Sequence, residues 1–403
     1  MSIILTPEEQ GMLDGREGPL VQKCMKVLVA LGNIYGAKRM VKVKSVHAPG
    51  VSYRVAGDAG LGYVSDASKL GKFKVPMTLN TTGIDCFDLE SLQFPADFVE
   101  GQLALNKAYE EMGGVPTYTC TPYVVGGCPS FGEHVAWGES SAIIYVNSVI
   151  GARTNREGGP TALAAAVCGC VPEYGYHLDE NRKATHLIDV DVDLKTNRDY
   201  AVMGYYVGSR VGNKVPCFTG VKEQPVVEQY KALGAALASS GGIALYHIEG
   251  FTPEAPEKEA VLAESYEVVH FGAEEYAEVE RKFTLHEPAD LVVIGCPHCT
   301  INEVAEVAGA VNGKTVKVDT WLCLSHQVYI LAERMGYIDI LTKAGVTIVR
   351  DTCPILCPTS PKGYKGVATN SGKLAHYIRG LWNMDSALVQ LDDCIKAALK
   401  EEC

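Results

Sequence analysis

Long apolar runs, an excess of basic residues and a recognisable leader segment are all missing from this sequence. No apolar run approaches the roughly 20 residues that a bilayer-spanning helix needs, and charged residues come too early in the chain for a signal peptide. The formal net charge is −12 and the isoelectric point is about 5.4. Since nucleic-acid binding requires a basic surface, this balance argues against a nucleic-acid partner. We therefore expect a cytoplasmic protein that binds neither membrane nor nucleic acid.

Charged residues are also sparse, at 21% of the chain, whereas cysteine is abundant, with 14 residues. Low charge and many oxidisable thiols argue against a hyperthermophilic source. In a reducing cytoplasm these thiols are not expected to form a disulfide framework. They are therefore candidates for buried packing residues, metal ligands or nucleophiles.

The 403 residues exceed what one ordinary hydrophobic core accommodates, so two or three domains are expected. Apolar strands alternate with helical segments, most clearly in the C-terminal third of the chain. This pattern predicts an α/β fold with parallel or mixed sheets flanked by helices. We divide the chain into an N-terminal α/β region at 1–186, a middle α/β region at 187–286 and a C-terminal α/β domain at 287–403.

Periodicity and capping signals predict several local elements. A single helix should run from the N-cap Thr6 to about Tyr35, and residues 61–70 should form another helix after a glycine-containing loop. Two apolar stretches, AIIYVN and YAVMGYYVG, are predicted to be strands. Polar and thiol groups that follow strands of a parallel sheet should gather at its carboxyl edge.

Two cysteines, Cys296 and Cys299, stand where a predicted strand joins a helix, in IGCPHCT. They match the C-x-x-C form of thiol–disulfide oxidoreductases, and a helix N-terminus lowers the pKa of a thiol. A plain redox enzyme leaves the cysteines of YTCTP and DTCP without a role. Thiolates of Cys120, Cys296 and Cys353 would suit iron or a cluster, although they follow no compact cluster motif. Packing of buried thiols at strand ends is the third interpretation.

The order of motifs along nearly the whole chain resembles the aconitase X family, a branch of the aconitase superfamily. The resemblance rests on HAPGVSYRVAGDAGLGY, VPMTLNTTGIDC, YTCTPYVVGGCPSFGEHVAWGESSAIIYVNSVIGARTNREGGP, IGCPHCT, VRDTCP and TNSGKLAHY. It implies an aconitase-like multi-domain fold whose cluster or iron ligands are Cys120, Cys296 and Cys353. The remaining thiols of these motifs would then pack or support the site: Cys128, Cys299 and Cys357.

The resemblance implies a hydro-lyase with an iron–sulfur cluster, which we expect to be [4Fe–4S]. With three protein ligands, one iron stays free to act as a Lewis acid on a substrate hydroxyl. Two activities are implied: dehydration of (R)-5-phosphomevalonate to trans-anhydromevalonate 5-phosphate in an archaeal-type mevalonate pathway to isoprenoids, and dehydration of cis-3-hydroxy-L-proline. The swivelling domain of the family, which carries a serine base, has no counterpart here, which implies a large subunit acting with a small subunit. We favour phosphomevalonate as the substrate, with cis-3-hydroxy-L-proline as the alternative. An alternative function of another class is thiol–disulfide exchange by Cys296 and Cys299.

Backbone and polar groups in two of these motifs are candidates for binding a small anionic substrate. Successive N–H groups at Gly50, Val51 and Ser52 would form an anion-binding concavity, unless the segment is an ordinary glycine turn. Asn80 and Thr81 offer an amide and a hydroxyl at a strand end, where exposed polarity is the alternative.

Three further candidates lie in the other motifs. Glu139 would orient a hydroxyl or move a proton beside Ser140, although Glu-Ser-Ser is also a turn sequence. Lys373 falls in the first turn of a predicted helix, where a cation is unfavourable for the helix dipole, and we therefore expect it to bind an anion. The alternative is a solvated surface lysine. His47 and His134 are candidate proton carriers, with a hydrogen-bonded structural role as the favoured alternative. Arg153 and Arg156 are expected to support the site, or else to brace the domain interface through salt bridges.

Overall fold

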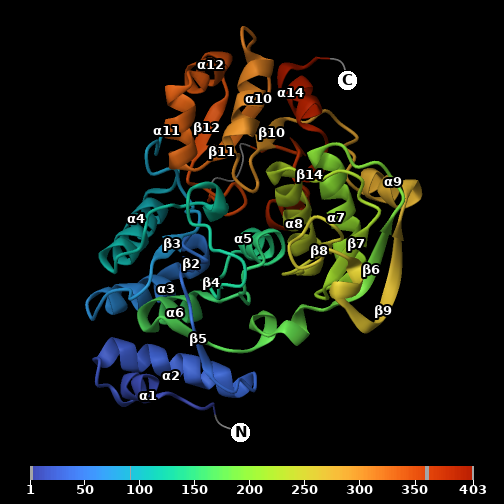
Figure 1. Cartoon of the computed structure of the whole chain (residues 1–403). Coiled ribbons are helices and arrows are strands. Elements are labelled where there is room, and N and C mark those ends of the chain that lie inside the picture. Colours follow the sequence, from blue (N-terminus) through green and yellow to red (C-terminus); the bar gives the residue numbers. More distant parts are fainter. Residues whose placement is uncertain (1–2, 91, 359–362, 402–403) are drawn as a thin grey trace.

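Residues 3–90, 92–358 and 363–401 are described by the computed structural model. Three parallel sheets and one antiparallel pair of strands, β1 (Met40–Lys42) and β5 (Cys170–Pro172), form its framework. Helices flank the parallel sheets in three successive parts of the chain (Figure 1). This arrangement confirms the predicted α/β fold of parallel or mixed sheets. Among the residues described, no helix combines the length and apolarity needed to cross a bilayer.

The first part contains a three-stranded parallel sheet in the order β3 (Met77–Leu79), β2 (Val46–Ala48), β4 (Ala136–Trp137). These strands are short and buried, because helices of the same part cover them. The alanine-rich helix α6 (Gly159–Cys168) packs against α2 (Pro19–Ile34) and β2. The helices are α1 (Pro7–Asp14), α2 (Pro19–Ile34), α3 (Tyr53–Ser68), α4 (Ala96–Glu111), α5 (Ser140–Tyr145) and α6 (Gly159–Cys168).

The second part has a four-stranded parallel sheet in the order β8 (His247–Ile248), β7 (Pro216–Thr219), β6 (Ala184–Val190), β9 (Leu262–Phe271). Its helices are α7 (Asn197–Val211), α8 (Val227–Gly241) and α9 (Ala273–Lys282). Helices α7 and α8 pack closely at Gly204, where an added Cβ would come within 2.7 Å of the Leu233 carbonyl oxygen. This close approach fixes the position of α8 relative to α7.

The third part has a five-stranded parallel sheet in the order β12 (Thr347–Arg350), β11 (Asp319–Leu324), β10 (Leu291–Ile294), β13 (Gly366–Thr369), β14 (Asp385–Leu388). Alternate residues of β10 face opposite cores, as the period of a strand requires: Val292 and Ile294 face one, Leu291 and Val293 the other. The first core is closed by α10 (Ile301–Val311), α11 (His326–Arg334), α12 (Tyr337–Ala344) and α14 (Leu391–Leu399), and the second by α13 (Gly372–Leu381).

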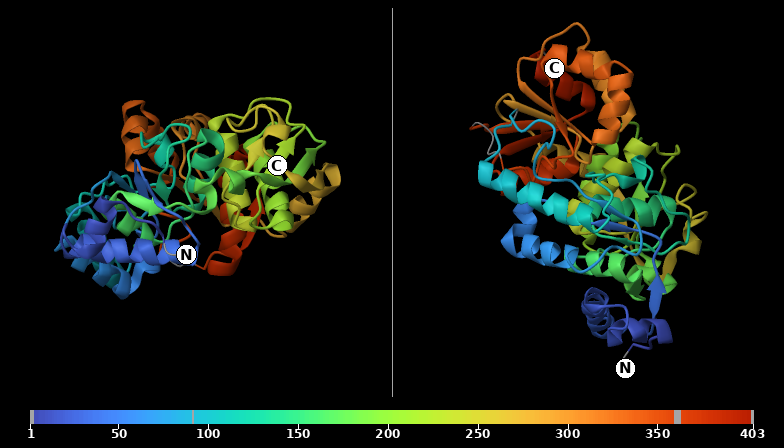
Figure 2. Two further views of the ribbon diagram at one scale, coloured as in Figure 1. Left: turned by 60° about the horizontal axis from the view of Figure 1, so that its bottom comes forward. Right: turned by 90° about the vertical axis from the view of Figure 1, so that its left-hand side faces the viewer.

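The three parts meet around a common centre. In Figure 1 the third part lies at the top, the second at the right, and the first at the left and below. Helices α1 and α2 form the end of the molecule away from the C-terminus, as the right-hand view of Figure 2 also shows. Helix α13 of the third part contacts both α7 and α8 of the second.

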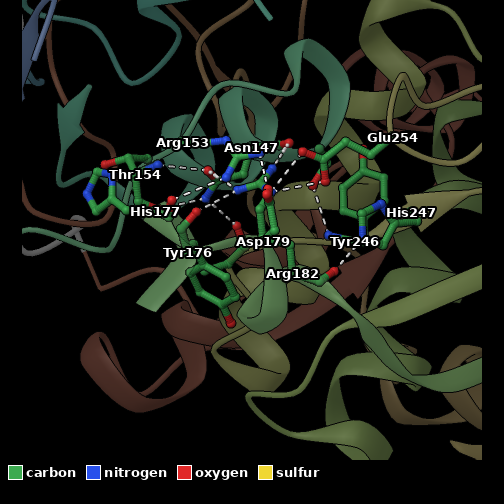
Figure 3. A network of polar contacts seen from close by, with 12 residues as sticks. Asn147, Arg153, Thr154, Tyr176, His177, Asp179, Arg182, Tyr246, His247 and Glu254 are labelled. Carbon is green, nitrogen blue, oxygen red and sulfur yellow. Dashed lines mark hydrogen bonds and ion pairs between the residues drawn. The ribbon is translucent and has the colours of Figure 1, made fainter. Parts of the chain in front are cut away.

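A buried arginine joins the first part to the second. The Arg182 guanidinium donates hydrogen bonds to the Asn147 carbonyl at 2.9 Å and the Tyr176 carbonyl at 3.1 Å, and it pairs with the Glu254 carboxylate at 2.8 Å (Figure 3). Asn147 lies in a π-helical segment, Val146–Ile150, that follows α5. Because these partners come from both parts, they fix α5 relative to the second sheet.

Two helix predictions in the N-terminal region are wrong in their limits. The helix predicted from Thr6 is divided into α1 and α2, because Gly15 and Gly18 take φ angles of +86° and +100° that end the first helix. The second helix begins at Tyr53 instead of residue 61, with Ser52 as its N-cap residue. Gly60 and Gly62 therefore lie in helix and not in a loop, whereas Gly57 takes a non-helical φ of +56° and kinks α3.

Two predicted strands are helices. AIIYVN forms most of α5 and the start of the π-helical segment, because Glu139 caps it by accepting a hydrogen bond from the Ala142 N–H at 2.7 Å. YAVMGYYVG lies in α7, which begins with a capping box between Thr196 and Asp199. Both stretches are buried on nearly all sides, so their apolar residues carry no period that distinguishes helix from strand.

Candidate active site

Two parallel sheets direct their carboxyl edges toward one cavity. In the third part, Cys296 follows β10, Cys353 follows β12 and Lys373 follows β13. In the first part, Asn80 directly follows β3, and Glu139 follows β4 by one residue. Loops after parallel strands meet at the same edge, as the sequence predicts. The site is therefore built between the first and third parts of the chain.

A short backbone bridge ties these two edges together. Thr82 pairs with Thr352 in parallel register, and its N–H donates to the Asp351 carbonyl at 2.8 Å. The Cys353 N–H in turn donates to the Thr82 carbonyl at 3.0 Å. Cys353 is thus fixed by the backbone to the segment that carries Asn80 and Thr81.

The cavity between the edges has a volume of about 170 Å³. Its wall carries thiols, an amide, a hydroxyl, a carboxylate and an ammonium group among apolar side chains. Seven predicted site residues line it: Asn80, Thr81, Cys120, Glu139, Cys296, Cys353 and Lys373. The other lining residues are Gly295, Pro297, His298, Pro354, Ile355, Leu356, Tyr377 and Leu381.

The three cysteines that the sequence singled out share this cavity although they are far apart along the chain. Burial raises the pKa of the Cys120 and Cys353 thiols above the usual range, and it raises the pKa of Cys296 to about 12. A charge on Cys296 raises the pKa of Cys120 further, and a charge on Cys353 raises that of Cys296. The ammonium of Lys373 opposes all three shifts and favours thiolates.

This donor set fits an iron–sulfur centre. Thiolates are the protein ligands that hold such clusters, and three thiols line this one cavity. The Lys373 ammonium favours their thiolate forms. Cys120, Cys296 and Cys353 are therefore the residues that would hold a cluster here.

Lys373 and Glu139 form a buried ion pair across the cavity. The Lys373 ammonium contacts the Glu139 carboxylate at 2.6 Å and donates to the hydroxyls of Ser140 and Ser141 at 3.1 and 2.9 Å. Burial acts against both charges, but each partner outweighs it, so the pKa of Glu139 lies below its usual value and that of Lys373 above. Both groups are therefore ionised at neutral pH. The predicted Ser140 enters the site through this contact and not as a lining residue.

His47 lies behind the strand-end residue Asn80. Its Nδ1 lies 2.8 Å from the Thr78 hydroxyl, its ring is fully buried, and burial lowers its pKa to about 4. The Glu139 carboxylate and the Asn80 side chain act in the opposite direction on that pKa but do not outweigh burial. His47 is thus a neutral structural histidine here and does not line the cavity.

The segment Gly50–Val51–Ser52 is not part of the cavity wall. It precedes α3, and Gly50 lines a separate cavity of about 630 Å³ on the side of that helix. Gln102 holds this loop, since its amide donates to the Val51 carbonyl at 2.7 Å and accepts from the Tyr53 N–H at 2.9 Å. The buried Ser52 hydroxyl has no hydrogen-bond partner within the described part of the chain. Anion binding by this loop stays a prediction.

The additional thiols of the site motifs lie apart from the cavity. Cys299 is buried among apolar residues of the core that α10 closes, on the opposite face of the sheet from Cys296. Burial raises the pKa of Cys299 well above the usual range, which opposes a reactive thiolate. Cys357 is also buried in a core, and Cys128 is exposed. None of the three lines the cavity.

Two residues of the site were missed from the sequence. His298 is buried, and its ring contacts both Thr119 and Thr352, the residues before Cys120 and Cys353. Lys231 reaches from α8 and donates to the His298 carbonyl at 3.0 Å. A signal existed for His298, because it stands inside the C-x-x-C segment. None existed for Lys231, whose contacts lie more than 60 residues away in sequence.

Arg153 and Arg156 brace the structure outside the cavity. Arg153 forms an ion pair with Asp179 and donates to the His177 carbonyl at 3.2 Å (Figure 3). Arg156 donates to the Gly242 carbonyl at 3.0 Å, a contact between the first and second parts. His134 lies against His177 with their Nδ1 atoms 2.9 Å apart. None of these side chains reaches the cavity wall.

Comparison with known proteins agrees with this architecture. Models of the first, second and third domains of aconitase X match residues 2–180, 184–281 and 289–400. The phosphomevalonate dehydratase large subunit of Methanocaldococcus jannaschii is 43% identical over 97% of this chain and 99% of that protein. That of Methanothermobacter thermautotrophicus is 44% identical over 95% and 96%.

Relatives with a second activity are more distant, and a solved structure shares the fold. The cis-3-hydroxy-L-proline dehydratase of Hypocrea jecorina is 32% identical over 99% of this chain but only 69% of that protein. The crystal structure of Thermococcus kodakaraensis aconitase X in its holo-form has a TM-score of 0.90 and 42% identity, covering 98% of this chain and 100% of that one. As the motifs predicted, the chain belongs to the aconitase X family.

Proposed function

We propose that this chain is the large subunit of an iron–sulfur hydro-lyase that dehydrates (R)-5-phosphomevalonate to trans-anhydromevalonate 5-phosphate in an archaeal-type mevalonate pathway. The observation that carries the proposal is the convergence of Cys120, Cys296 and Cys353 on the cavity that also holds the Lys373–Glu139 ion pair. Thiols suited to iron and groups suited to an oxygen-rich anion thus share one enclosed space.

The comparisons support phosphomevalonate over cis-3-hydroxy-L-proline as the substrate. Five relatives named phosphomevalonate dehydratase large subunit are 34–44% identical, four of them at 42–44%, against 32% for two named cis-3-hydroxy-L-proline dehydratase. The match covers 94–99% of those five large subunits but 69% of each hydroxyproline enzyme. The name of the first group supports a two-chain enzyme with a small subunit. We propose that this partner carries the swivelling domain and its serine base.

The three cavity thiols would hold the cluster, which we propose to be [4Fe–4S]. When bound, such a cluster with three protein ligands supplies an iron that acts as a Lewis acid on a hydroxyl group. Lys373 lines the same cavity, and its charge favours the thiolate forms of the three cysteines. The ammonium thus offsets part of the negative charge that three thiolates and an anionic substrate bring together.

The remaining groups bind and orient the substrate. The ionised Glu139 can accept a hydrogen bond from a substrate hydroxyl, and its contact with Lys373 keeps it deprotonated while it does so. The Asn80 amide and the Thr81 hydroxyl, at the end of β3, can donate to a phosphate or carboxylate. We retain Gly50, Val51 and Ser52 as proposed phosphate-binding groups and Ser140 as a group that steadies Lys373.

Anaerobic assay of the two-chain enzyme tests the proposal. The chain is purified with its small subunit, its iron and sulfide are measured, and each candidate substrate is supplied separately. Conversion of (R)-5-phosphomevalonate to a product lighter by one water, together with bound iron and sulfide, supports the proposal. Conversion of cis-3-hydroxy-L-proline alone would overturn the substrate, and absence of iron and sulfide from an otherwise folded enzyme would overturn the cluster.

A further inference from the structure

His298 is placed between all three cysteine-bearing loops. It belongs to the segment of Cys296, two residues further along the chain. Its Nδ1 lies 3.1 Å from the hydroxyl of Thr119, the residue before Cys120. Its Nε2 lies 3.0 Å from the carbonyl of Thr352, the residue before Cys353. One side chain therefore contacts the neighbours of both other cysteines.

The hydrogen bonds of this ring have a defined direction. The Thr352 carbonyl only accepts, so His298 Nε2 carries the proton and donates it. In the neutral ring Nδ1 is then an acceptor, and the Thr119 hydroxyl donates to it. The Thr119 oxygen also accepts from the Thr121 N–H at 3.1 Å, which is compatible with that direction. All three groups are thus satisfied in one arrangement.

The backbone of the same residue reinforces these contacts. Its N–H donates to the Cys120 sulfur at 3.3 Å, which favours a thiolate there. Its carbonyl accepts from the buried Lys231 ammonium at 3.0 Å. The ring is 1% exposed, so no solvent competes for these bonds. His298 is therefore held from the second part while it contacts the first and third.

We propose that His298 is a positioning residue that sets the mutual spacing of Cys120, Cys296 and Cys353, and so governs assembly and retention of the cluster. The proposal rests on the cluster of the proposed function. A buried histidine with an ordinary packing role would contribute to stability but would not change the spacing of the three thiols. Partners that orient metal ligands in this way typically change metal affinity by about 10- to 100-fold when removed.

Variants separate the two ring contacts. His298→Gln can retain a donor near the Nε2 position and loses the contact with Thr119, whereas His298→Asn can retain the Thr119 contact and loses Thr352. His298→Ala loses both. The matched control is His247→Gln. His247 is equally buried, and its Nε2 lies 2.8 Å from the Arg182 carbonyl oxygen. It belongs to β8 of the second part and does not line the cavity that the three cysteines share.

The measurement is iron and sulfide content after anaerobic reconstitution, followed by the rate of cluster loss to a chelator. We expect His298→Ala to lose its cluster about 10- to 100-fold faster than the unsubstituted chain, with the two conservative variants between them. His247→Gln should lose it at the unsubstituted rate. Equal content, spectrum and loss rate in all His298 variants would overturn the proposal.

A second readout needs no metal. In the apo-protein, His298→Ala should increase backbone hydrogen exchange at residues 117–122 and 351–357, which belong to different parts of the chain, and His247→Gln should leave both unchanged. If the unsubstituted chain binds no iron, the cluster of the proposed function fails, and the exchange data still decide the role of His298. Unchanged exchange in both segments would refute the coupling.

Discussion

A buried ammonium beneath the Cys296 loop gives the sharpest stability prediction. Lys231 on α8 pairs with Glu303 on α10, with side chains 4% and 6% exposed. Burial acts to lower the pKa of Lys231, but the Glu303 and Glu228 carboxylates outweigh it and hold that pKa above its usual value. The Thr300 hydroxyl donates to Glu228 at 2.6 Å and the Thr300 N–H to Glu303 at 2.8 Å, so both carboxylates lie around one residue.

Replacing Lys231 with methionine keeps much of the side-chain volume and leaves these two carboxylates without their cation. Removing one partner of a buried ion pair typically costs about 3–5 kcal/mol. Because each 1.4 kcal/mol is a factor of ten, hydrogen-exchange protection of residues 291–311 should fall roughly 140- to 4,000-fold, provided that this segment opens locally. Exchange is the suitable assay, since a multi-part chain does not unfold in a single two-state step.

Two further variants test the reasoning. The double variant Lys231→Met/Glu303→Gln removes one uncompensated charge, while the glutamine amide still caps α10. Hydrogen-exchange protection of residues 291–311 should therefore be at least about tenfold higher than in Lys231→Met alone. Lys222→Met breaks an exposed pair with Asp193, whose side chains are 74% and 55% exposed, and should leave the protection of residues 291–311 unchanged, because water screens such a pair. If the double variant were no better protected than Lys231→Met, a buried unpaired charge would not be the cause of the lost protection. Equal losses of protection in Lys231→Met and Lys222→Met would lead to the same conclusion.

Three other outcomes are expected. Gly295 has a φ of +101°, and an added Cβ would lie 2.1 Å from the Cys323 carbonyl oxygen. Gly295→Ala should therefore displace Cys296 and lower the iron content of the anaerobic enzyme several-fold. An unchanged iron content would contradict this geometry. Cys299→Ser should retain iron and lose about 1–3 kcal/mol of stability by burying a hydroxyl, whereas Cys120→Ser should lose the cluster; the reverse pattern would favour a redox pair. Burial raises the pKa of Glu157, so the folded state binds the carboxyl proton more tightly than the unfolded state, and Glu157 destabilises the fold as pH rises above the unfolded pKa. Glu157→Gln should therefore raise the thermal unfolding midpoint at pH 7 to 8 and not at pH 4. An equal rise at both pH values would count against this explanation.

The sequence could predict the parts of the site that follow strands of a regular sheet. Cys296, Cys353 and Lys373 each follow a parallel strand, and the rule that such loops share an edge places them together. It could not predict how that edge faces the first part, because the joining bridge at Thr82 and Thr352 pairs residues 270 positions apart. Cys120 follows no strand of that sheet. Its motif made it one candidate thiolate among several, and the resemblance to a family favoured it as a ligand.

Local structure was hardest to predict where burial removes periodicity. Helices α5 and α7 contain apolar residues on nearly every side, so hydrophobic spacing favours neither helix nor strand. Capping residues carried the missing information: Thr196 with Asp199 marks the start of α7, and Glu139 marks the start of α5. The same carboxylate therefore caps a helix with one oxygen and binds Lys373 with the other.

That double use of Glu139 ties the chemistry of the site to the packing of the domains. Its Oε2 is fixed by the Ala142 N–H of α5, and the π-helical segment after α5 is held by Arg182 at the junction with the second part. Its Oε1 is fixed by Lys373 of the third part. A shift of either neighbouring part would thus move the carboxylate relative to the three thiols. The cavity is accordingly set by all three parts at once. A group bound at the thiols would therefore also stabilise the arrangement of the parts, since binding to the assembled state adds to its stability.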